Sequence, residues 1–268
     1  MSIKEGLLSV VVRTMAGREL ECLRALQGIA ASSHRSIEII LVYQGRAEDV
    51  DTAAIQTAAA HRPVAVLGNP TKADERSRNL NIGWEAAKGR YIAFLDDDDN
   101  IEPNHYSLLI GALCGSDKAW AYSRTALRAE SADLQLLSET FPFDRPQFSL
   151  LELWRQNFIP IHSFLIDRFR LPEIMAQRPF CEALTRGEDW DFLLHLAYYR
   201  EPLYVDTVSC YYYVSAERGN TNQSIRPVEV DAATAQRDAA EWARCKVLVL
   251  ARRAELDCLL YTSPSPRD

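Results

Sequence analysis

The sequence has no dense stretch of lysine and arginine. Its 30 basic residues are outnumbered by 37 acidic ones, and the formal net charge is −7. A protein that neutralises the phosphates of DNA or RNA ordinarily presents a strongly basic face. The charge balance therefore argues against a nucleic acid as the partner.

Long apolar runs are also missing. No run reaches the roughly 20 residues that a membrane-spanning helix requires. The apolar part of the first segment, MSIKEGLLSVVVRT, is too short for the central region of a signal peptide. We therefore expect a cytoplasmic protein without a transmembrane segment, and peripheral association with a membrane stays open.

Cysteines are few and scattered. The six cysteines show no C-x-x-C spacing and are too sparse for a disulfide framework. The sequence therefore predicts neither a structural zinc site nor a disulfide scaffold. We expect reduced thiols that serve mostly as packing residues.

A glycine-rich phosphate loop is absent as well. Many α/β proteins hold nucleotide phosphates on such a turn at the start of a helix. Here the first apolar strand leads into RTMAGREL, which has one glycine, and neither G-x-G-x-x-G nor G-x-x-x-x-G-K-[S/T] occurs. Any bound phosphate must be held by other groups.

The first half of the chain alternates short apolar runs with segments of helical length. The expected strands are 7–12, 37–42, 63–67 and 91–95, and the expected helices are 20–30, 49–60 and 75–87. This order is typical of βαβ units and predicts an α/β fold with a mainly parallel sheet flanked by helices. Functional loops are then expected at the carboxyl ends of the strands.

The second half is less regular and reads as a mixed sheet added to the first. The expected helices are 103–113, 190–199 and 229–255, and the expected strands are 119–123, 164–166, 203–205 and 210–214. A hydrophobic content of 47% supports a sizeable core. We expect a single domain with a C-terminal helical extension, divided into 1–115, 116–225 and 226–257.

The last eleven residues, CLLYTSPSPRD, differ in character from what precedes them. The string resembles the translation of a sequencing adaptor. We therefore expect 258–268 to be non-native and the native chain to continue differently beyond 257. A disordered native tail is the alternative.

The densest negative charge in the chain directly follows an apolar strand. YIAFL runs into four consecutive aspartates at 96–99. Two unit charges about 4 Å apart repel by roughly 4 kcal/mol at an effective dielectric constant near 20, so water or a cation must relieve the cluster. Mg²⁺ and Mn²⁺ accept carboxylates and fill their remaining positions with phosphate oxygens and water. The run is therefore a candidate metal site; an acidic solvated loop is the alternative.

Four blocks of the sequence, in this order, resemble the inverting glycosyltransferases of family two, which have the Rossmann-like GT-A fold. They are SVVVRTMAGRE, IEIILVYQG, RSRNLNIGWEAAKGRYIAFLDDDDNIEP and GEDWDFLLHL. The resemblance spans about 7–222. It implies transfer of a sugar from a nucleoside-diphosphate sugar to a hydroxyl of a glycan or other acceptor, in polysaccharide, cell-surface glycan or glycoconjugate synthesis. Residues 1–115 would then bind the nucleotide sugar and 116–225 the acceptor.

The resemblance also implies roles for the aspartate run. Asp98 corresponds to the family's direct metal ligand, and Asp96 to a residue near both the metal and the sugar nucleotide. Asp97 is expected at the donor. Both Asp97 and Asp99 are expected either to tune the local charge or to cap the following helix. The implied cofactor is Mn²⁺ or Mg²⁺.

Further donor contacts are implied outside the aspartate run. Thr14 ends the first strand, where the family's loop lies along the nucleobase and ribose; a simple turn residue is the alternative. Gln44 replaces the aspartate that usually accepts a hydrogen bond from the base, and its amide carbonyl can still accept one. Arg76 and Arg78 precede the Asn-Ile-Gly of 81–83. One of them, preferably Arg78, is expected at the diphosphate; a solvated helix face is the alternative.

Glu188 and Asp189 in GEDWD correspond to the family's catalytic pair. Asp189 is implied as the general base that takes the proton of the attacking acceptor hydroxyl, and Glu188 as the residue that positions the acceptor. The same carboxylates would also suit the first turn of a helix, and both roles are compatible. His162 and Trp190 are candidates for the acceptor pocket, although a lone histidine beside an apolar strand is more often a packed residue.

Two other functions stay open. A nucleotidyltransferase on a related sheet would also use carboxylates and Mg²⁺, but RTMAGREL lacks the glycine-rich signature that such an enzyme needs. A non-catalytic sugar- or cation-binding module with the same fold would not need the pair of Glu188 and Asp189. Both features favour the glycosyltransferase.

Overall fold

A curled nine-stranded sheet organises the computed structural model, which describes residues 3–71, 73–131, 133, 135–175, 177–215 and 232–262. The strands are β1 (Lys4–Met15), β2 (Ile37–Gln44), β3 (Val64–Gly68), β4 (Gly89–Asp96), β5 (Asn100–Ile101), β6 (Trp120–Glu130), β7 (Leu136–Thr140), β8 (Phe164–Asp167) and β9 (Leu203–Ser215). Their order is β3-β2-β1-β4-β8-β6-β9-β5, with β7 paired to β6. The strands β1 to β4 are parallel, whereas β8 runs antiparallel to both β4 and β6.

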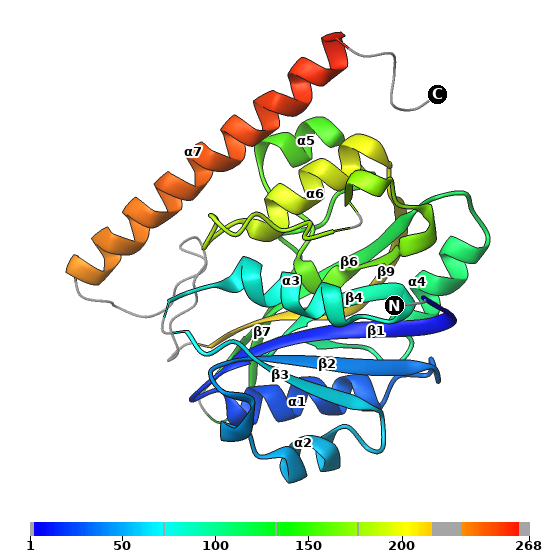
Figure 1. Cartoon of the computed structure of the whole chain (residues 1–268), viewed down its shortest axis with the longest axis vertical. Coiled ribbons are helices and arrows are strands. Elements are labelled where there is room, and N and C mark those ends of the chain that lie inside the picture. Colours follow the sequence, from blue (N-terminus) through cyan, green and yellow to red (C-terminus); the bar gives the residue numbers. More distant parts are fainter. Residues whose placement is uncertain are drawn as a thin grey trace.

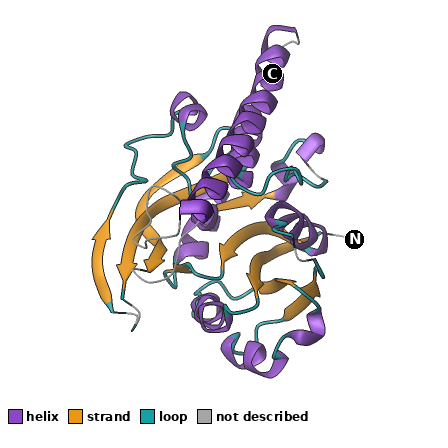
Figure 2. Cartoon of the chain, turned by 90° about the vertical axis from the view of Figure 1, so that its left-hand side faces the viewer, coloured by secondary structure: helices purple, strands orange, loops and turns teal. Residues whose placement is uncertain are grey.

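Helices cover both faces of this sheet (Figures 1 and 2). They are α1 (Glu19–Ala30), α2 (Thr52–Ala58), α3 (Arg76–Ala86), α4 (His105–Cys114), α5 (Leu150–Arg155), α6 (Glu188–Tyr199) and α7 (Ala232–Thr262), with short 3₁₀ turns at Ala47–Asp49, Ile161–Ser163, Arg168–Arg170 and Glu173–Met175. The α/β fold with a mixed, mainly parallel sheet and a C-terminal helix is confirmed. None of the described helices is both long and apolar enough to cross a membrane.

The central strands are mainly apolar because both of their faces are buried. In β4, Ile92 and Phe94 pack into the core under α3 and α6, whereas Ala93 and Leu95 pack into the opposite core with α1 and α4. A strand covered on both faces loses the alternation of polar and apolar residues that a half-exposed strand shows. The buried apolar run of β4 therefore ends at Asp96, at the carboxyl end of the strand.

The second half departs from the expected elements in three places. The two strands expected at 203–205 and 210–214 are one strand, β9, which continues past polar residues through shifts in its pairing with β6. Strand β7 and helix α5 were not expected at all. Strand β7 is exposed along its length, and α5 has only six residues, so neither carries a strong hydrophobic pattern.

The C-terminal helix α7 packs against α6 and extends past it (Figure 1). Cys245 and Val249 on its inner side belong to the same core as α6. The helix continues to Thr262, beyond the expected end at 255, and its first expected residues, 229–231, lie outside the described part. The domain division at 225 and the non-native origin of 258–268 stay predictions.

Helix α3, which carries Arg76 at its first position, lies unusually close to β1 at Gly83. A Cβ atom added to Gly83 would lie 2.2 Å from Cγ1 of Val11, which is buried in β1. We expect Gly83→Ala to lower the free energy of unfolding by about 1–3 kcal/mol, because the core must shift to admit the methyl group. Urea unfolding followed by circular dichroism measures this change.

The matched control is Gly111→Ala in α4, where an added Cβ would meet nothing within 4 Å. Alanine is favoured over glycine in a helix by about 1 kcal/mol, so this variant should be as stable as the parent or more stable. Equal stability of the two variants would contradict the close packing of α3 on β1.

Candidate active site

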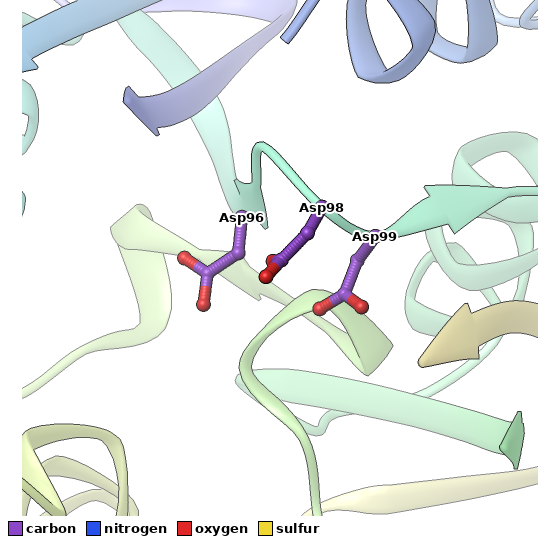
Figure 3. A group of neighbouring side chains, drawn as sticks. All are labelled: Asp96, Asp98 and Asp99. Atoms are coloured by element: carbon purple, nitrogen blue, oxygen red, sulfur yellow. The ribbon is translucent and has the colours of Figure 1, made fainter. Parts of the chain in front are cut away.

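The aspartate run forms a tight turn between β4 and β5 at the carboxyl edge of the sheet. Three of its carboxyl groups, those of Asp96, Asp98 and Asp99, offer oxygen atoms that all lie within 4.8 Å of one another. Figure 3 shows these three side chains pointing to the same side of the chain. The structure therefore adds Asp99 to the two ligands expected from the sequence.

Arg13 at the end of β1 holds the first of these carboxylates. The pairing of β1 with β4 places Arg13 opposite Asp96, and the guanidinium donates from Nε to Oδ1 at 2.6 Å and from Nη2 to Oδ2 at 2.9 Å. Its Nη1 donates to Oε1 of Glu188 at 2.5 Å. Burial opposes ionisation of Asp96, but Arg13 outweighs it and lowers the pKa of that carboxyl.

Arg18 lies on the other side of the cluster. Its Nη1 is 2.7 Å from Oδ2 of Asp98 and 3.1 Å from Oδ1 of Asp97. Burial, with the neighbouring charge of Asp98, nevertheless raises the pKa of Asp97 to about 7. Negative charge in the turn is thus not fully compensated by the arginines, and hard oxygen ligands in this arrangement fit a divalent cation.

Asp99 is held by contacts with Tyr213 of β9 and with His162. Its Oδ1 accepts a hydrogen bond from the backbone N–H of Tyr213 at 3.0 Å, and its Oδ2 lies 2.8 Å from Nδ1 of His162. Burial opposes a charge on His162, but the carboxylate raises the pKa of the imidazole well above its ordinary value. His162 thus borders the site, but its side chain is fully buried and paired with Asp99.

Two clefts meet at the aspartate turn. The first, called the β-edge cleft, has a volume of about 400 Å³ and is lined by Arg13, Thr14, Met15, Arg18, Gln44, Asp74, Arg76, Asn79, Asp96, Asp97, Asp98, Asp99 and Tyr212. The second, called the helical cleft, has a volume of about 450 Å³ and is bordered by residues near α5, α6 and α7. Both clefts share Arg13, Arg76, Asp96, Asp99 and Tyr212.

The β-edge cleft contains the predicted donor residues of the first two strands. Thr14 lines this cleft together with Asp97. Gln44 donates from Nε2 to the carbonyl oxygen of Ala73 at 2.9 Å, and its Oε1 accepts from Nδ2 of Asn79 at 3.2 Å. The amide of Gln44 is therefore held in one orientation at the end of β2, with Oε1 as an acceptor.

The two candidate arginines of α3 lie in different surroundings. Arg76 lines both clefts. Its Nε donates to Oδ1 of Asp74 at 3.1 Å, and Asp74 also pairs with Arg186. Arg78 pairs with Glu75 at 3.3 Å, its side chain is 52% exposed, and it lines neither described cleft. Residues two apart on a helix face nearly opposite directions, so the geometry favours Arg76 over Arg78.

The predicted catalytic pair, Glu188 and Asp189, forms the first two residues of α6. The preceding residue, Gly187, has a left-handed backbone conformation with a φ of 69°. Both carboxylates line the helical cleft. Glu188 is buried against Arg13, whereas Asp189 is half-buried and its Oδ2 accepts a hydrogen bond from Nδ2 of Asn157 at 2.7 Å. Burial, followed by the charge of Glu188, raises the pKa of Asp189 to about 7, which is a suitable value for a general base near neutral pH.

Trp190 borders the helical cleft but is largely buried. Its Nε1 donates to the carbonyl oxygen of Leu153 in α5 at 2.6 Å. The indole thus links α5 to the start of α6. Its expected contact with the acceptor stays a prediction, as does that of His162.

Sequence reasoning missed several residues of these clefts. Arg13 and Arg18 were not singled out, although the parallel register that brings Arg13 beside Asp96 follows from aligning the two apolar strands. The start of α5 also carried a signal: the hydroxyl of Ser149 caps the helix by accepting from the N–H of Glu152, as in a capping box. Asn157, which follows that helix, carried no recognisable signal.

The contact of Arg13 with two carboxylates generates a prediction about stability. Arg13→Met leaves Asp96 and the buried Glu188 without their cation, and we expect a loss of about 3 kcal/mol in the free energy of unfolding at pH 7. The loss should shrink as the pH falls and Asp96, whose pKa Arg13 lowers, is protonated. Chemical unfolding at several pH values measures it.

The double variant Arg13→Met/Glu188→Gln is the control, because it also removes the buried charge that lost its partner. It should recover part of the stability. If Arg13→Met is as stable as the parent at pH 7, the guanidinium does not link the two carboxylates in solution.

Comparison with known proteins identifies the family. The family model described as "Glycosyl transferase family 2" matches residues 9–171. No curated protein matches the chain at the threshold applied. Among solved structures, S. aureus TarS is similar, with a TM-score of 0.59 at 15% sequence identity over 78% of this chain and 37% of that chain.

Two structures of TarS residues 1–349 are similar in the same way. The complex with UDP-GlcNAc has a TM-score of 0.59 at 16% identity and covers 83% of this chain and 62% of that chain. The complex with UDP has a TM-score of 0.58 at 16% identity and covers 78% and 61%. This chain thus spans less than two thirds of these TarS structures, and the likeness shows a shared fold. On the evidence of the family model, the chain belongs to glycosyl transferase family 2.

Proposed function

We propose that the protein is a metal-dependent, inverting glycosyltransferase that moves one sugar from a nucleoside-diphosphate sugar to an acceptor hydroxyl. The observation that carries the proposal is the meeting of two clefts at one carboxylate cluster, with Asp189 in the helical cleft only. A donor in the β-edge cleft would then have its reacting carbon near the junction. An acceptor in the helical cleft would approach it from the side of Asp189.

The β-edge cleft has the groups that a nucleoside diphosphate needs. Gln44 offers an oriented carbonyl oxygen to the base, and Thr14 lies at the end of the neighbouring strand β1. Arg76 supplies a positive charge for the diphosphate. Asp96, Asp98 and Asp99 would hold Mn²⁺ or Mg²⁺. When bound, such an ion stabilises the negative charge of the leaving diphosphate. The TarS structures contain UDP and UDP-GlcNAc, which supports a uridine-diphosphate sugar as the first donor to test.

The helical cleft has the groups that the acceptor needs. The acceptor oxygen attacks C1 of the donor sugar, the bond from C1 to the diphosphate oxygen breaks, and Asp189 takes the hydroxyl proton. Asn157 holds Oδ2 of Asp189, and Arg13 holds Glu188 beside it for contact with the acceptor. A single displacement of this kind inverts the configuration at C1. The raised pKa of Asp189 supports this role over that of a binding module, which needs no base.

The metal requirement is tested in a screen of donor sugars. With Mn²⁺, we expect release of nucleoside diphosphate from one class of donor, loss of activity in excess EDTA, and recovery when Mn²⁺ or Mg²⁺ is added. Asp98→Asn should weaken donor binding and leave the fold intact. Asp117→Asn, an exposed residue outside both clefts, is the control. Full turnover in excess EDTA would refute the metal requirement.

The general base is tested with Asp189→Asn, which keeps the size of the side chain but cannot take a proton. We expect kcat to fall by on the order of 10²- to 10⁴-fold with little change in donor affinity. In the parent enzyme, kcat/KM should fall as the pH drops below about 7, because the raised pKa leaves less of the carboxylate ionised. The variant should lack this acid limb.

The stereochemical outcome completes this test. An α-linked donor should yield a β-linked product, which the NMR coupling of the anomeric proton reports. Retained configuration, or an Asp189→Asn enzyme as fast as the parent, would show that Asp189 is not the base of an inverting transfer.

A further inference from the structure

One face of α7 forms a wall of the helical cleft. Trp242, Lys246 and Val249 lie at positions i, i+4 and i+7 of the helix, and all three line the cleft. This spacing puts them on one stripe of an α-helix. The C-terminal helix thus contributes to the same cleft as Glu188 and Asp189, although it follows them in sequence by more than fifty residues.

This wall is held in place by contacts beyond the cleft. The guanidinium of Arg252 donates to the buried carboxylate of Asp191 in α6 at 2.9 and 3.1 Å. Nη1 of Arg253 donates to the carbonyl oxygen of Trp154 in α5 at 2.8 Å. Helix α7 is therefore fixed to both α6 and α5, and the stripe that carries Lys246 has a defined position.

The inner carboxylates of the helical cleft already have partners. Arg13 pairs with Asp96 and Glu188, and His162 pairs with Asp99. The fourth, Asp189, accepts from Asn157. Each of these four carboxylates thus has a partner within the chain itself.

Two cations that line the same cleft have no such partner among the described residues. Arg155 ends α5 and Lys246 lies on α7; both line the helical cleft, both are exposed, and neither lines the β-edge cleft. Within the residues that the structure describes, neither side chain makes a hydrogen bond or an ion pair with another residue. In a chain whose net charge is −7, two such cations in one cleft are not a by-product of a basic composition.

We propose that the acceptor is anionic: it carries a phosphate or carboxylate group beside its reacting hydroxyl, and Arg155 and Lys246 bind that group. This inference rests on the proposed function, because it assigns the helical cleft to the acceptor. Two aromatic residues, Trp242 and Phe143, also line this cleft, and aromatic rings are suited to stacking on a sugar ring. Both cations lie outside the β-edge cleft, so they serve the acceptor and not the donor diphosphate.

Direct binding tests this proposal without turnover. Isothermal titration calorimetry at low ionic strength would compare p-nitrophenyl glucosides and galactosides in three forms: neutral, 6-phosphate and uronide. We expect at least one anionic form to bind about tenfold more tightly than its neutral counterpart, as one hydrogen bond to a charged group implies. The 6-phosphate and uronide arms distinguish phosphate from carboxylate as the recognised group.

The variants Lys246→Gln and Arg155→Gln should each remove most of this preference and leave binding of the neutral probe and of the donor unchanged. Arg237→Gln removes the same charge from an exposed position of α7 outside the cleft and should keep the preference. A loss of packing alone would weaken the neutral and anionic probes equally, so the ratio of the two affinities is the decisive readout.

Equal binding of neutral and anionic probes, or a preference that survives both substitutions, would overturn the proposal. Release of nucleoside diphosphate with water as acceptor is measured on the same preparations. If no donor releases nucleoside diphosphate, the result counts against the proposed function. The comparison of neutral and anionic probes is then still a separate test of the cleft. Release of diphosphate without a preference for anionic probes would contradict only the acceptor inference.

Discussion

The ion pairs of Arg13 with Asp96 and Glu188 connect the two halves of the candidate site. Asp96 belongs to β4 and to the first half of the chain, whereas Glu188 opens α6 in the second half. A guanidinium has five N–H donors in a rigid fork, so it can hold one carboxylate through two hydrogen bonds and still reach another. The position of Glu188 at the start of α6 thus depends on a residue of the first strand.

The sheet explains why charge collects where it does. Its central strands are buried on both faces, so the middle of each strand is mainly apolar, and parallel strands end at the same edge. Thr14, Gln44 and Asp96 therefore meet at one edge although they are far apart in sequence. The helical cleft adjoins this edge, and its walls come from short helices and α7, which differ in character from the regular first half.

The sequence predicted those parts of the fold and site that have a strong local pattern of apolar or charged residues. The doubly buried strands and the aspartate turn were predictable, because continuous apolar runs and clustered carboxylates are rare by chance. Helix α5 was not expected, since its six residues show no period and only the Ser149 cap marks it. The bridge made by Arg13 requires the register of two strands. Arg155 and Lys246 line the same cleft only because α5 and α7 both pack on α6, and the sequence contains no pattern for this packing.

The central claim is that the carboxylates at the end of β4 hold a divalent cation together with the diphosphate of a donor. The most direct measurement is anomalous diffraction at the manganese edge from crystals grown with Mn²⁺ and uridine diphosphate. Our account predicts an anomalous peak at coordination distance from the carboxylates of Asp96, Asp98 or Asp99, bridged to the diphosphate in the β-edge cleft. A diphosphate bound in the helical cleft, or a cluster without manganese when uridine diphosphate is bound, would contradict it.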